Sequence, residues 1–375
     1  MTRVQKITLG FLSVSACSVW LVILYIGLQK YQTWSQQPLG PTLAYPTQLK
    51  LPATWTAAPI ATQPTTTRAP TLISETQTAV PPFLYCNNSL PSMTILALGT
   101  DVRPGQHRSG LTDVMRAVRV DFQGQRVTTL EFPRDLWVQI PGIEQRLGTD
   151  HQKLNTAYAY GGGPEHGPSL LASTLDLNFG LKVDHYILAN MTVFAEVVDT
   201  LGGLDITIPP GGINGRTNTD RSERLVFPEG PQHLSGDQAL TLARIRNISV
   251  FERAENQNLV LCALQKKVES PEMVLRLPAI INSFMSNIQT DLTPEQISQL
   301  ACLGTQMPRS NILFAAFPRE LFHAAEVYDS VLNQKVFIWD VDFDELRNYV
   351  SDFQAGTWPS SSPSGVSEPA TGNCE

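Results

Sequence analysis

Hydrophobic and polar residues follow two spacings between Ser92 and about residue 355. Runs such as MTILALG and VDHYILAN are continuous or alternating, which predicts strands. Stretches such as GPSLLASTLDLNFG and TVFAEVVDTLGG have apolar residues at helical spacing and end on glycine, which predicts helices. These segments interleave along the chain, and no internal repeat is visible. The pattern therefore predicts an α/β domain with a mixed central sheet flanked by helices on both faces.

Some of the strand neighbours are also predicted. VMRAVRVDF and RVTTLEF flank the short turn Gln123-Gly124-Gln125, so we expect them to form an antiparallel hairpin. MTILALG is continuously apolar, as is typical of a central strand that is buried on both faces. Two later segments, NILFAAFP and KVFIWDV, are expected to close the sheet. KLNTAYAYGGG is expected to form a helical turn that ends on glycines.

The N-terminal end has a different pattern. Residues 7–29 carry no charge and are long enough to cross a bilayer as a helix. Arg3 and Lys6 precede this span, so residues 1–6 are expected to be cytoplasmic and the domain extracytoplasmic, in a single-pass protein of the cell membrane. A cleaved signal peptide fits less well, because its apolar core would be shorter. A lipoprotein box ending at Cys17 fits less well too, because apolar residues follow it.

The two ends of the chain differ in composition from the segment between them. Residues 30–89 are rich in Pro and Thr and are expected to form an extracytoplasmic linker without a core of their own. Residues 90–355 are expected to form the folded domain, and residues 356–375 a disordered Ser/Pro-rich tail. The formal net charge of -7 argues against nucleic acid as a partner, because a phosphate-binding surface is normally basic.

Four cysteines would lie outside the membrane, and sequence alone leaves their pairing open. Cys262 and Cys302 both fall in helical patterns, so a bridge between those helices is one candidate. The alternative is that the cysteines are small buried hydrophobic residues. The four are Cys86, Cys262, Cys302 and Cys374.

Charged residues occur where predicted strands begin or end. Asp101 and Arg103 follow the first strand, Asp113 precedes the second, and Arg134 and Asp135 follow the third in FPRDLWVQIPG. A solvated turn with a local ion pair is the simple interpretation of Arg134 and Asp135. Ligands of α/β sheets, however, bind at strand ends. Two carboxylates at one site need a cation between them, and Mg²⁺ binds one or two carboxylates together with water and phosphate oxygens.

A second group of polar residues lies in the predicted helices after residue 235. Arg244 and Arg246 can reach one ligand only if their helix stops near Arg244, because residues two apart do not share a helical face. Arg253 and Gln257 are four apart and do share one. Several arginines close together repel one another unless an anion is present, and a pyrophosphate supplies such an anion through two-pronged contacts.

Other motifs are absent or incomplete. GGGPEHG lacks the Lys-Ser/Thr end of a phosphate-binding loop, so turn formation explains its glycines. The sequence contains no HExxH, GxSxG or CxxC, and the six histidines show no metal-ligand spacing.

The segment from Met93 to about Lys267 resembles the LytR-CpsA-Psr family of cell-envelope proteins. The resemblance rests on LALGTDVRP, TDVM, FPRDLWVQIPG, KLNTAYAYGGG, VDHYI, VDTLGGLDITIP, LSGDQALTLARIR and ENQ in this order. It implies a membrane-anchored phosphotransferase that moves a glycopolymer from a polyprenyl-pyrophosphate carrier onto peptidoglycan, and Mg²⁺ (or Mn²⁺) as cofactor. The implied metal ligands are Asp101 and Asp113. The implied pyrophosphate contacts are Arg103, Arg134, Arg244, Arg246, Arg253 and Gln257, and the catalytic set is Asp101, Asp113, Arg134, Arg244 and Arg246.

The chain departs from the family pattern at three places. Leu111, Val250 and Asn256 stand where the family usually has Arg, Asp and Arg, so the site is expected to be active with less positive charge. A polyprenyl-pyrophosphate-binding or scaffold protein without turnover is the alternative function. Transcriptional regulation, suggested by the family's historical name, conflicts with an acidic extracytoplasmic domain without a DNA-binding motif.

Two parts of the expected mechanism stay open. Asp101, Asp113 and Asp135 are all candidates for the general base, although a metal ligand is a poor base. Apolar residues of the helices after Gly163 are expected to line a slot for the lipid tail.

Overall fold

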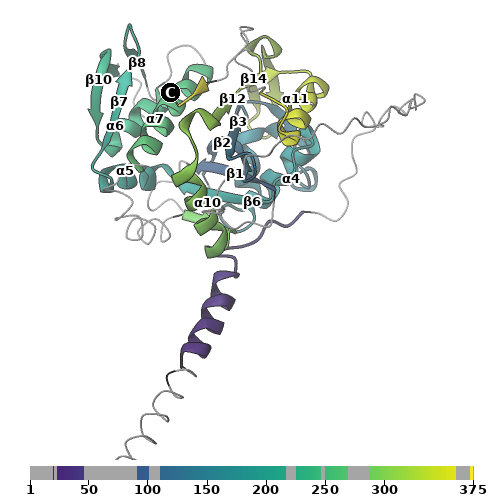
Figure 1. Ribbon diagram of the computed structural model, residues 1–375. Coiled ribbons are helices and arrows are strands. Elements are labelled where there is room, and N and C mark those ends of the chain that lie inside the picture. Colours follow the sequence, from purple (N-terminus) through teal and green to yellow (C-terminus); the bar gives the residue numbers. More distant parts are fainter. Residues whose placement is uncertain are drawn as a thin grey trace, which may run out of the picture.

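The computed structural model describes residues 20, 23–45, 91–100, 110–216, 225–245, 250–268, 288–359 and 372–374. Its centre is a seven-stranded sheet in the order β11-β6-β1-β2-β3-β12-β15 (Figure 1). β1 pairs antiparallel with β2 and parallel with β6, and β3 pairs antiparallel with β2 and parallel with β12. The mixed sheet and the β2–β3 hairpin are therefore confirmed. The strands are β1 (Ser92–Thr100), β2 (Thr112–Asp121), β3 (Arg126–Glu131), β6 (His185–Asn190), β11 (Ile288–Thr290), β12 (Ile312–Ala315) and β15 (Gly372–Asn373).

Helices cover both faces of this sheet (Figure 1). Alternate strand residues such as Leu96, Leu98, Met115 and Ala117 pack in one core with α4 (Gly167–Phe179) and α11 (Phe343–Ala355). The opposite face is covered by α5 (Met191–Thr200), α6 (Gly236–Arg244) and α7 (Val250–Val268), and near its end by α10 (Pro294–Gln306). Because successive side chains of a strand point to opposite faces, neighbouring residues of these strands pack in different cores.

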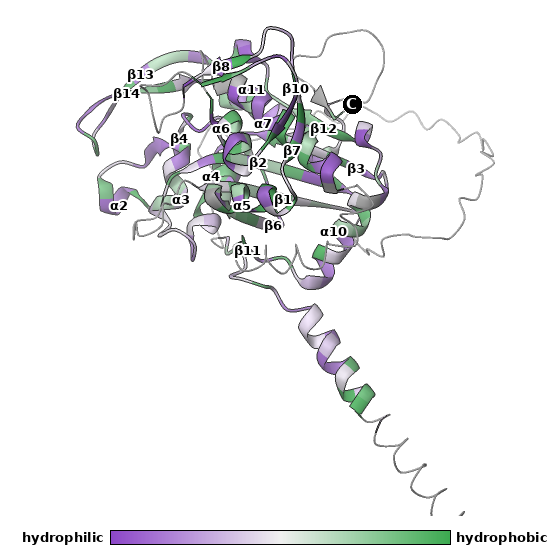
Figure 2. Ribbon diagram, turned by 90° about the vertical axis from the view of Figure 1, so that its left-hand side faces the viewer, coloured by the Kyte–Doolittle hydropathy of each residue, from purple (hydrophilic) through white to green (hydrophobic). Residues whose placement is uncertain are grey.

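Within the described ranges, four short strand pairs lie outside the main sheet. The segment KVFIWDV was predicted to close the main sheet, and that prediction is wrong. It forms β14, which pairs with β13 in a separate hairpin (Figure 2). The edge beyond β3 is occupied instead by β12 and then by β15. The pairs are β4 (Trp137–Gln139) with β5 (His151–Lys153), β7 (Leu204–Ile208) with β10 (Gly230–Leu234), β8 (Ile213–Gly215) with β9 (Leu225–Phe227), and β13 (His323–Asp329) with β14 (Gln334–Asp340).

Short helical turns complete the described elements. The predicted turn in KLNTAYAYGGG is present as η2 followed by α3. These turns are α2 (Glu144–Leu147), η2 (Leu154–Thr156), α3 (Ala157–Tyr160), η3 (Arg309–Asn311) and η4 (Arg319–Leu321).

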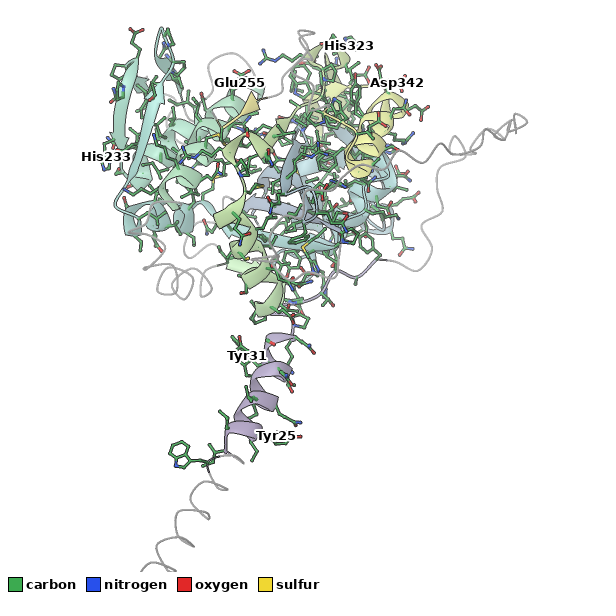
Figure 3. The ribbon with its side chains drawn as sticks, viewed as in Figure 1. Tyr25, Tyr31, His233, Glu255, His323 and Asp342 are labelled. Carbon is green, nitrogen blue, oxygen red and sulfur yellow. A yellow bond between two sulfur atoms is a disulfide. The ribbon has the colours of Figure 1, made fainter. Side chains whose placement is uncertain are left out.

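The N-terminal described segment begins as a helix over residues 23–35, which extends away from the domain with Tyr25 and Tyr31 exposed on it (Figure 3). None of the described helices is both long and apolar enough to cross a membrane. Residues 7–19, 21 and 22 of the predicted span lie outside the described residues, so the anchor stays a prediction.

Part of the predicted linker lies against the domain. The Leu39 amide donates to the Leu292 carbonyl (3.2 Å), and the Tyr45 hydroxyl donates to the Val183 carbonyl (2.8 Å). Residues 46–90 lie outside the described residues, and for them the linker remains an expectation.

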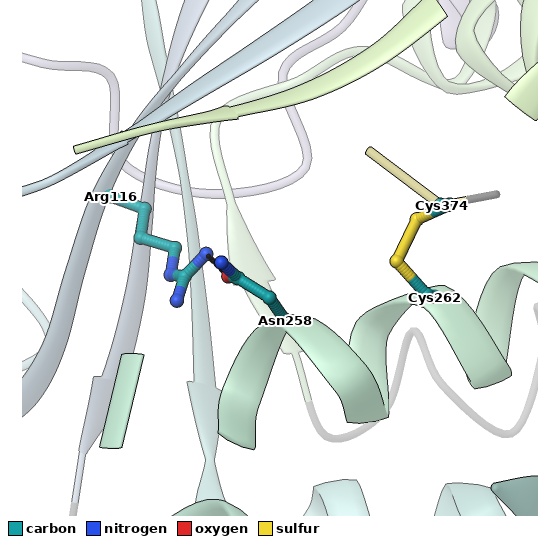
Figure 4. The surroundings of a disulfide bond; sticks show 4 residues. All are labelled: Arg116, Asn258, Cys262 and Cys374. Carbon is teal, nitrogen blue, oxygen red and sulfur yellow. Dashed lines mark hydrogen bonds between the residues drawn. A yellow bond between two sulfur atoms is a disulfide. The ribbon is translucent and has the colours of Figure 1, made fainter. Parts of the chain in front are cut away.

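The end of the chain is tied to α7 by a disulfide between Cys262 and Cys374 (Figure 4). Cys262 and Cys374 are therefore bridged rather than being merely small buried hydrophobic residues, and the candidate Cys262–Cys302 bridge is wrong. Cys302 is also disulfide-bonded. The pairing follows from β15, which adds to β12 and so brings residue 374 beside α7. Residues 356–359 and 372–374 of the expected tail are among the described residues, whereas residues 360–371 and 375 are not, so for these the disordered tail stays a prediction.

Candidate functional site

The strand-end residues predicted from the sequence meet at one edge of the sheet. β3 ends at Glu131, and the Phe132 amide still donates to the Met115 carbonyl of β2. Because β2 runs the opposite way, its first residues lie beside the segment that follows β3. The Arg134 guanidinium forms an ion pair with the Asp113 carboxylate through Nη1. The Arg134 side chain is only 17% exposed, so the turn is not solvated, although its local ion pair between Arg134 and Asp135 is present.

Asp135 holds Arg134 from the other side. One carboxylate oxygen of Asp135 accepts from Arg134 Nε (3.3 Å), and the other accepts from Lys153 Nζ on β5 (2.8 Å). The backbone carbonyl of Asp135 accepts from the Trp339 amide (3.1 Å), which fixes the turn against β14. Asp135 therefore orients Arg134. The sequence analysis did not identify Lys153, whose only local signal is a cation just before the predicted helical turn.

The ends of α6 are set by local sequence. Ser235 caps the helix and forms a capping box with Gln238, which satisfies two backbone amides of the first turn. α6 ends at Arg244, and Ile245 leaves the helical conformation with ψ 135°. The expected helix end near Arg244 is confirmed. Arg244 lines a cavity described below, whereas Arg246 lies outside the described residues.

Arg253 and Gln257 face the sheet from successive turns of α7. Arg253 Nη2 donates to the Asp113 backbone carbonyl (2.5 Å), and its Nε has no hydrogen-bond partner among the described residues. Both side chains are buried, as expected for residues on one helical face. Asp113 therefore forms an ion pair with Arg134 through its carboxylate and accepts a hydrogen bond from Arg253 through its backbone carbonyl.

The two arginines beside Asp113 differ electrostatically. Burial disfavours the charged form of Arg134, but Asp113 and Asp135 outweigh it and raise its pKa. Burial lowers the pKa of Arg253, against opposing contributions from Glu131 and Asp113. A buried, under-compensated guanidinium with a spare N–H is suited to an anionic ligand.

Arg116 is a buried residue that the sequence analysis missed. It lies in the middle of β2 and forms an ion pair with Glu131 of β3 (2.7 Å). It also donates to Asn258 Oδ1 on α7 (2.7 Å; Figure 4). A further hydrogen bond joins it to Gln257 Oε1 on the same helix (3.1 Å). The signal was present in the sequence, because Val114 and Val118 flank Arg116 on the same face of a buried strand.

An apolar cavity of about 420 Å³ lies between the sheet and helices α5 to α7. Arg116, Arg244 and Gln257 are among its polar lining residues. Of the helices after Gly163, α4 packs in the core on the opposite face of the sheet, whereas α5, α6 and α7 line this cavity. The lipid slot itself stays a prediction. The apolar lining includes Leu98, Val114, Val118, Ile187, Phe194, Leu240, Val260, Leu261, Ile312 and Phe314.

The predicted metal ligands are only partly described. Asp101 and Arg103 lie outside the described residues, and within the described part no group of three or more metal-ligating side chains occurs. Asp113 places one carboxylate at the start of β2, and its role as a metal ligand stays a prediction. A site of one or two carboxylates completed by water and phosphate oxygens fits Mg²⁺, whereas a protein-only zinc site would need more ligands.

Most of the chain matches a known protein family. The LytR_cpsA_psr family model matches residues 63–350. The chain belongs to the LytR_cpsA_psr family. The family resemblance seen in the sequence is thereby confirmed.

Individual family members are distant from this chain. It is 27% identical over 202 residues to the polyisoprenyl-teichoic acid–peptidoglycan teichoic acid transferase TagV of Bacillus subtilis, a match that covers 53% of this chain and 49% of TagV. It is 29% identical over 211 residues to the regulatory protein MsrR of Staphylococcus aureus, covering 55% of this chain and 58% of MsrR. The chain spans about half the length of the curated relatives it matches.

Solved structures of family members share the fold. The crystal structure of Bacillus subtilis TagV matches with a TM-score of 0.54 and 21% identity, covering 70% of this chain and 96% of that one. TagT bound to LI-WTA matches with a TM-score of 0.52 and 21% identity, covering 71% and 90%. At this identity the likeness supports the fold alone.

Proposed function

We propose that this protein is a membrane-anchored phosphotransferase that moves a glycopolymer from a polyprenyl-pyrophosphate carrier onto peptidoglycan or another envelope acceptor. The observation that carries the proposal is the continuity of an apolar cavity with a group of arginines. Gln257 lines the cavity, and Arg253, one turn earlier on α7, contacts Asp113 beside Arg134. An amphiphile with an apolar chain and an anionic head matches both parts. The name of TagV supports the same class of substrate and acceptor.

In the proposed reaction the apolar chain lies in the cavity and the pyrophosphate lies against Arg134, Arg244 and Arg253. An acceptor hydroxyl oxygen attacks the phosphorus on the glycosyl side. The new P–O bond forms as the bond between that phosphorus and the bridging oxygen breaks, and polyprenyl phosphate leaves. The hydroxyl proton passes to a carboxylate, for which Asp101, Asp113 and Asp135 are candidates. The arginines stabilise the charge that develops on the transferred group and the leaving phosphate.

The proposal includes a magnesium ion held by Asp101 and Asp113. Such an ion would supply further positive charge beside the phosphate oxygens. The chain's own part is to hold the Asp113 carboxylate at the sheet edge, and this is done by Arg134. Arg103 and Arg246 are proposed as additional pyrophosphate contacts.

The test uses the full-length protein in detergent with a short polyprenyl-pyrophosphoryl oligosaccharide, a peptidoglycan fragment and Mg²⁺. Mass spectrometry should detect the oligosaccharide joined to the fragment through a phosphodiester, with an equal amount of polyprenyl phosphate. Arg253→Met should abolish most of this product. The matched control is Arg319→Met, an exposed arginine on η4 that pairs with Glu255 on the outer side of α7.

Two results separate the proposal from its alternative. Tight binding of the donor without product, with several acceptors, would favour a binding or scaffold protein that does not turn over. Absence of binding would contradict both functions. Formation of product by Arg253→Met at the rate of the unchanged protein would contradict the assignment of this site.

A further inference from the structure

Arg116 connects the wall of the cavity to α7. It is 5% exposed and projects from β2 on the face that lines the cavity. Its Nη2 donates to Glu131 and to Gln257, and its Nη1 donates to Asn258. Arg116 Nε has no hydrogen-bond partner among the described residues and is itself buried. A charged group is costly to bury beside an apolar cavity, and Glu131 only partly offsets that cost.

The contact with Arg116 fixes the orientation of the Gln257 amide. A guanidinium carries donors and no acceptor, so the Gln257 atom that faces Arg116 must be the carbonyl oxygen. The amide nitrogen of Gln257 therefore points away from Arg116. Its contact with the Ala243 carbonyl is 3.5 Å, at the outer limit of a hydrogen bond. The amide nitrogen of Gln257 can thus donate a hydrogen bond to a ligand at the point where the cavity approaches Arg253.

We propose that Arg116 is a positioning residue that locks Gln257 as a hydrogen-bond donor and so makes the site select a pyrophosphate headgroup over a neutral one. This inference rests on the proposed function. Without Arg116 the amide can rotate by half a turn and present its oxygen, which repels a phosphate oxygen. The effect on an anionic headgroup should therefore exceed the effect on an uncharged headgroup with the same apolar chain.

The experiment measures the dissociation constants of farnesyl pyrophosphate and farnesol with full-length protein in detergent. The preference for the pyrophosphate is the dissociation constant of farnesol divided by that of farnesyl pyrophosphate. Arg116→Met should lower the preference roughly tenfold or more, as expected for the loss of one hydrogen bond to a charged group. Arg116→Lys keeps the charge and the fold, yet one ammonium cannot hold Glu131, Gln257 and Asn258 together, so it should lose most of the preference too.

The matched control is Arg119→Met. Arg119 lies on the same strand but on the opposite face, where its Nε donates to the Gln354 carbonyl (3.1 Å). This variant should lose stability without changing the preference. A purely structural Arg116 would behave in the same way, with a lower Tm and an unchanged ratio of constants.

A double-mutant cycle decides whether Arg116 acts through Gln257. Gln257→Leu alone should lower the preference, and adding Arg116→Lys to Gln257→Leu should lower it no further. The inference would be overturned if the two substitutions lowered the preference additively. It would also be overturned if Arg116→Lys left the preference unchanged. If the unchanged protein itself shows no preference for the pyrophosphate, the proposed function fails first. That outcome is distinct from failure of the Arg116 inference alone.

Discussion

Arg134 and Asp113 form an ion pair that joins the segment after β3 to the start of β2 at one edge of the sheet. The same Asp113 accepts a hydrogen bond from Arg253 of α7 through its backbone carbonyl. The start of β2 thus contacts both Arg134, at the edge of the sheet, and Arg253, on the helix that covers the sheet. Both guanidinium groups therefore contact Asp113, one at its side chain and one at its backbone.

Arg134→Lys should lower the transfer rate. Arg134 contacts Asp113 through Nη1 and Asp135 through Nε, and a lysine has a single nitrogen that cannot serve both while contacting a phosphate. The expected fall is roughly ten- to a hundredfold, the value of one charge-assisted hydrogen bond. The rate is measured with the polyprenyl-pyrophosphoryl oligosaccharide. Arg146→Lys is the control, because Arg146 contacts Tyr160 away from the site. A rate within about twofold of the unchanged protein would refute this role for Arg134.

Asp113→Asn should raise the concentration of Mg²⁺ that the reaction needs. The amide keeps the size of the side chain but loses the charge that both Arg134 and a cation need. The concentration of Mg²⁺ that gives half-maximal rate should rise by about tenfold or more, in line with the loss of a charged ligand. The control is Asp205→Asn, an exposed carboxylate on β7 that pairs with His233 (2.6 Å). An unchanged Mg²⁺ titration for Asp113→Asn would show that the metal site lies elsewhere.

Cys262→Ser should destabilise the domain. The disulfide with Cys374 spans 112 residues and holds the two-residue strand β15 on β12. Loss of a cross-link over so long a loop is expected to cost roughly 2–5 kcal/mol. Thermal unfolding is the measurement. Cys374→Ser should lower Tm by the same amount, and the double variant should be no worse than either single one. Additive losses would show that the two cysteines act separately.

Tyr158→Phe should reduce the loss of stability at alkaline pH. The Tyr158 hydroxyl is buried without a hydrogen-bond partner among the described residues, and burial raises its pKa to about 12. An unfolded tyrosine titrates near pH 10. Between about pH 10 and pH 12 the unfolded chain releases a proton that the folded protein retains, so stability falls as pH rises.

The measurement compares Tm at pH 7 with Tm near pH 11. At pH 7 the free energy of unfolding of Tyr158→Phe should differ from that of the unchanged protein by less than about 1 kcal/mol, because no hydrogen bond is lost. At higher pH its Tm should fall less steeply. Parallel curves for both proteins would mean that Tyr158 titrates normally in the fold.

The sequence by itself determined the class of the fold, the succession of most strands and helices, and the family to which the chain belongs. Helix and strand periodicities are local, and so are the capping of α6 at Ser235 and its end at Arg244. The arginines were recognisable because their motifs lie in a fixed order along the chain. Residue types and local spacing were sufficient for these conclusions.

Only the tertiary structure decided which distant segments meet. The pairing of Cys262 with Cys374, the exclusion of β14 from the main sheet and the position of the cavity all depend on which edge or face a segment occupies. Arg116 illustrates the reason. Its strand was predicted, but the contacts with Glu131 and Gln257 join residues 15 and 141 positions away. A pattern read along the chain contains no distance between such residues, because packing of α7 against the sheet sets that distance.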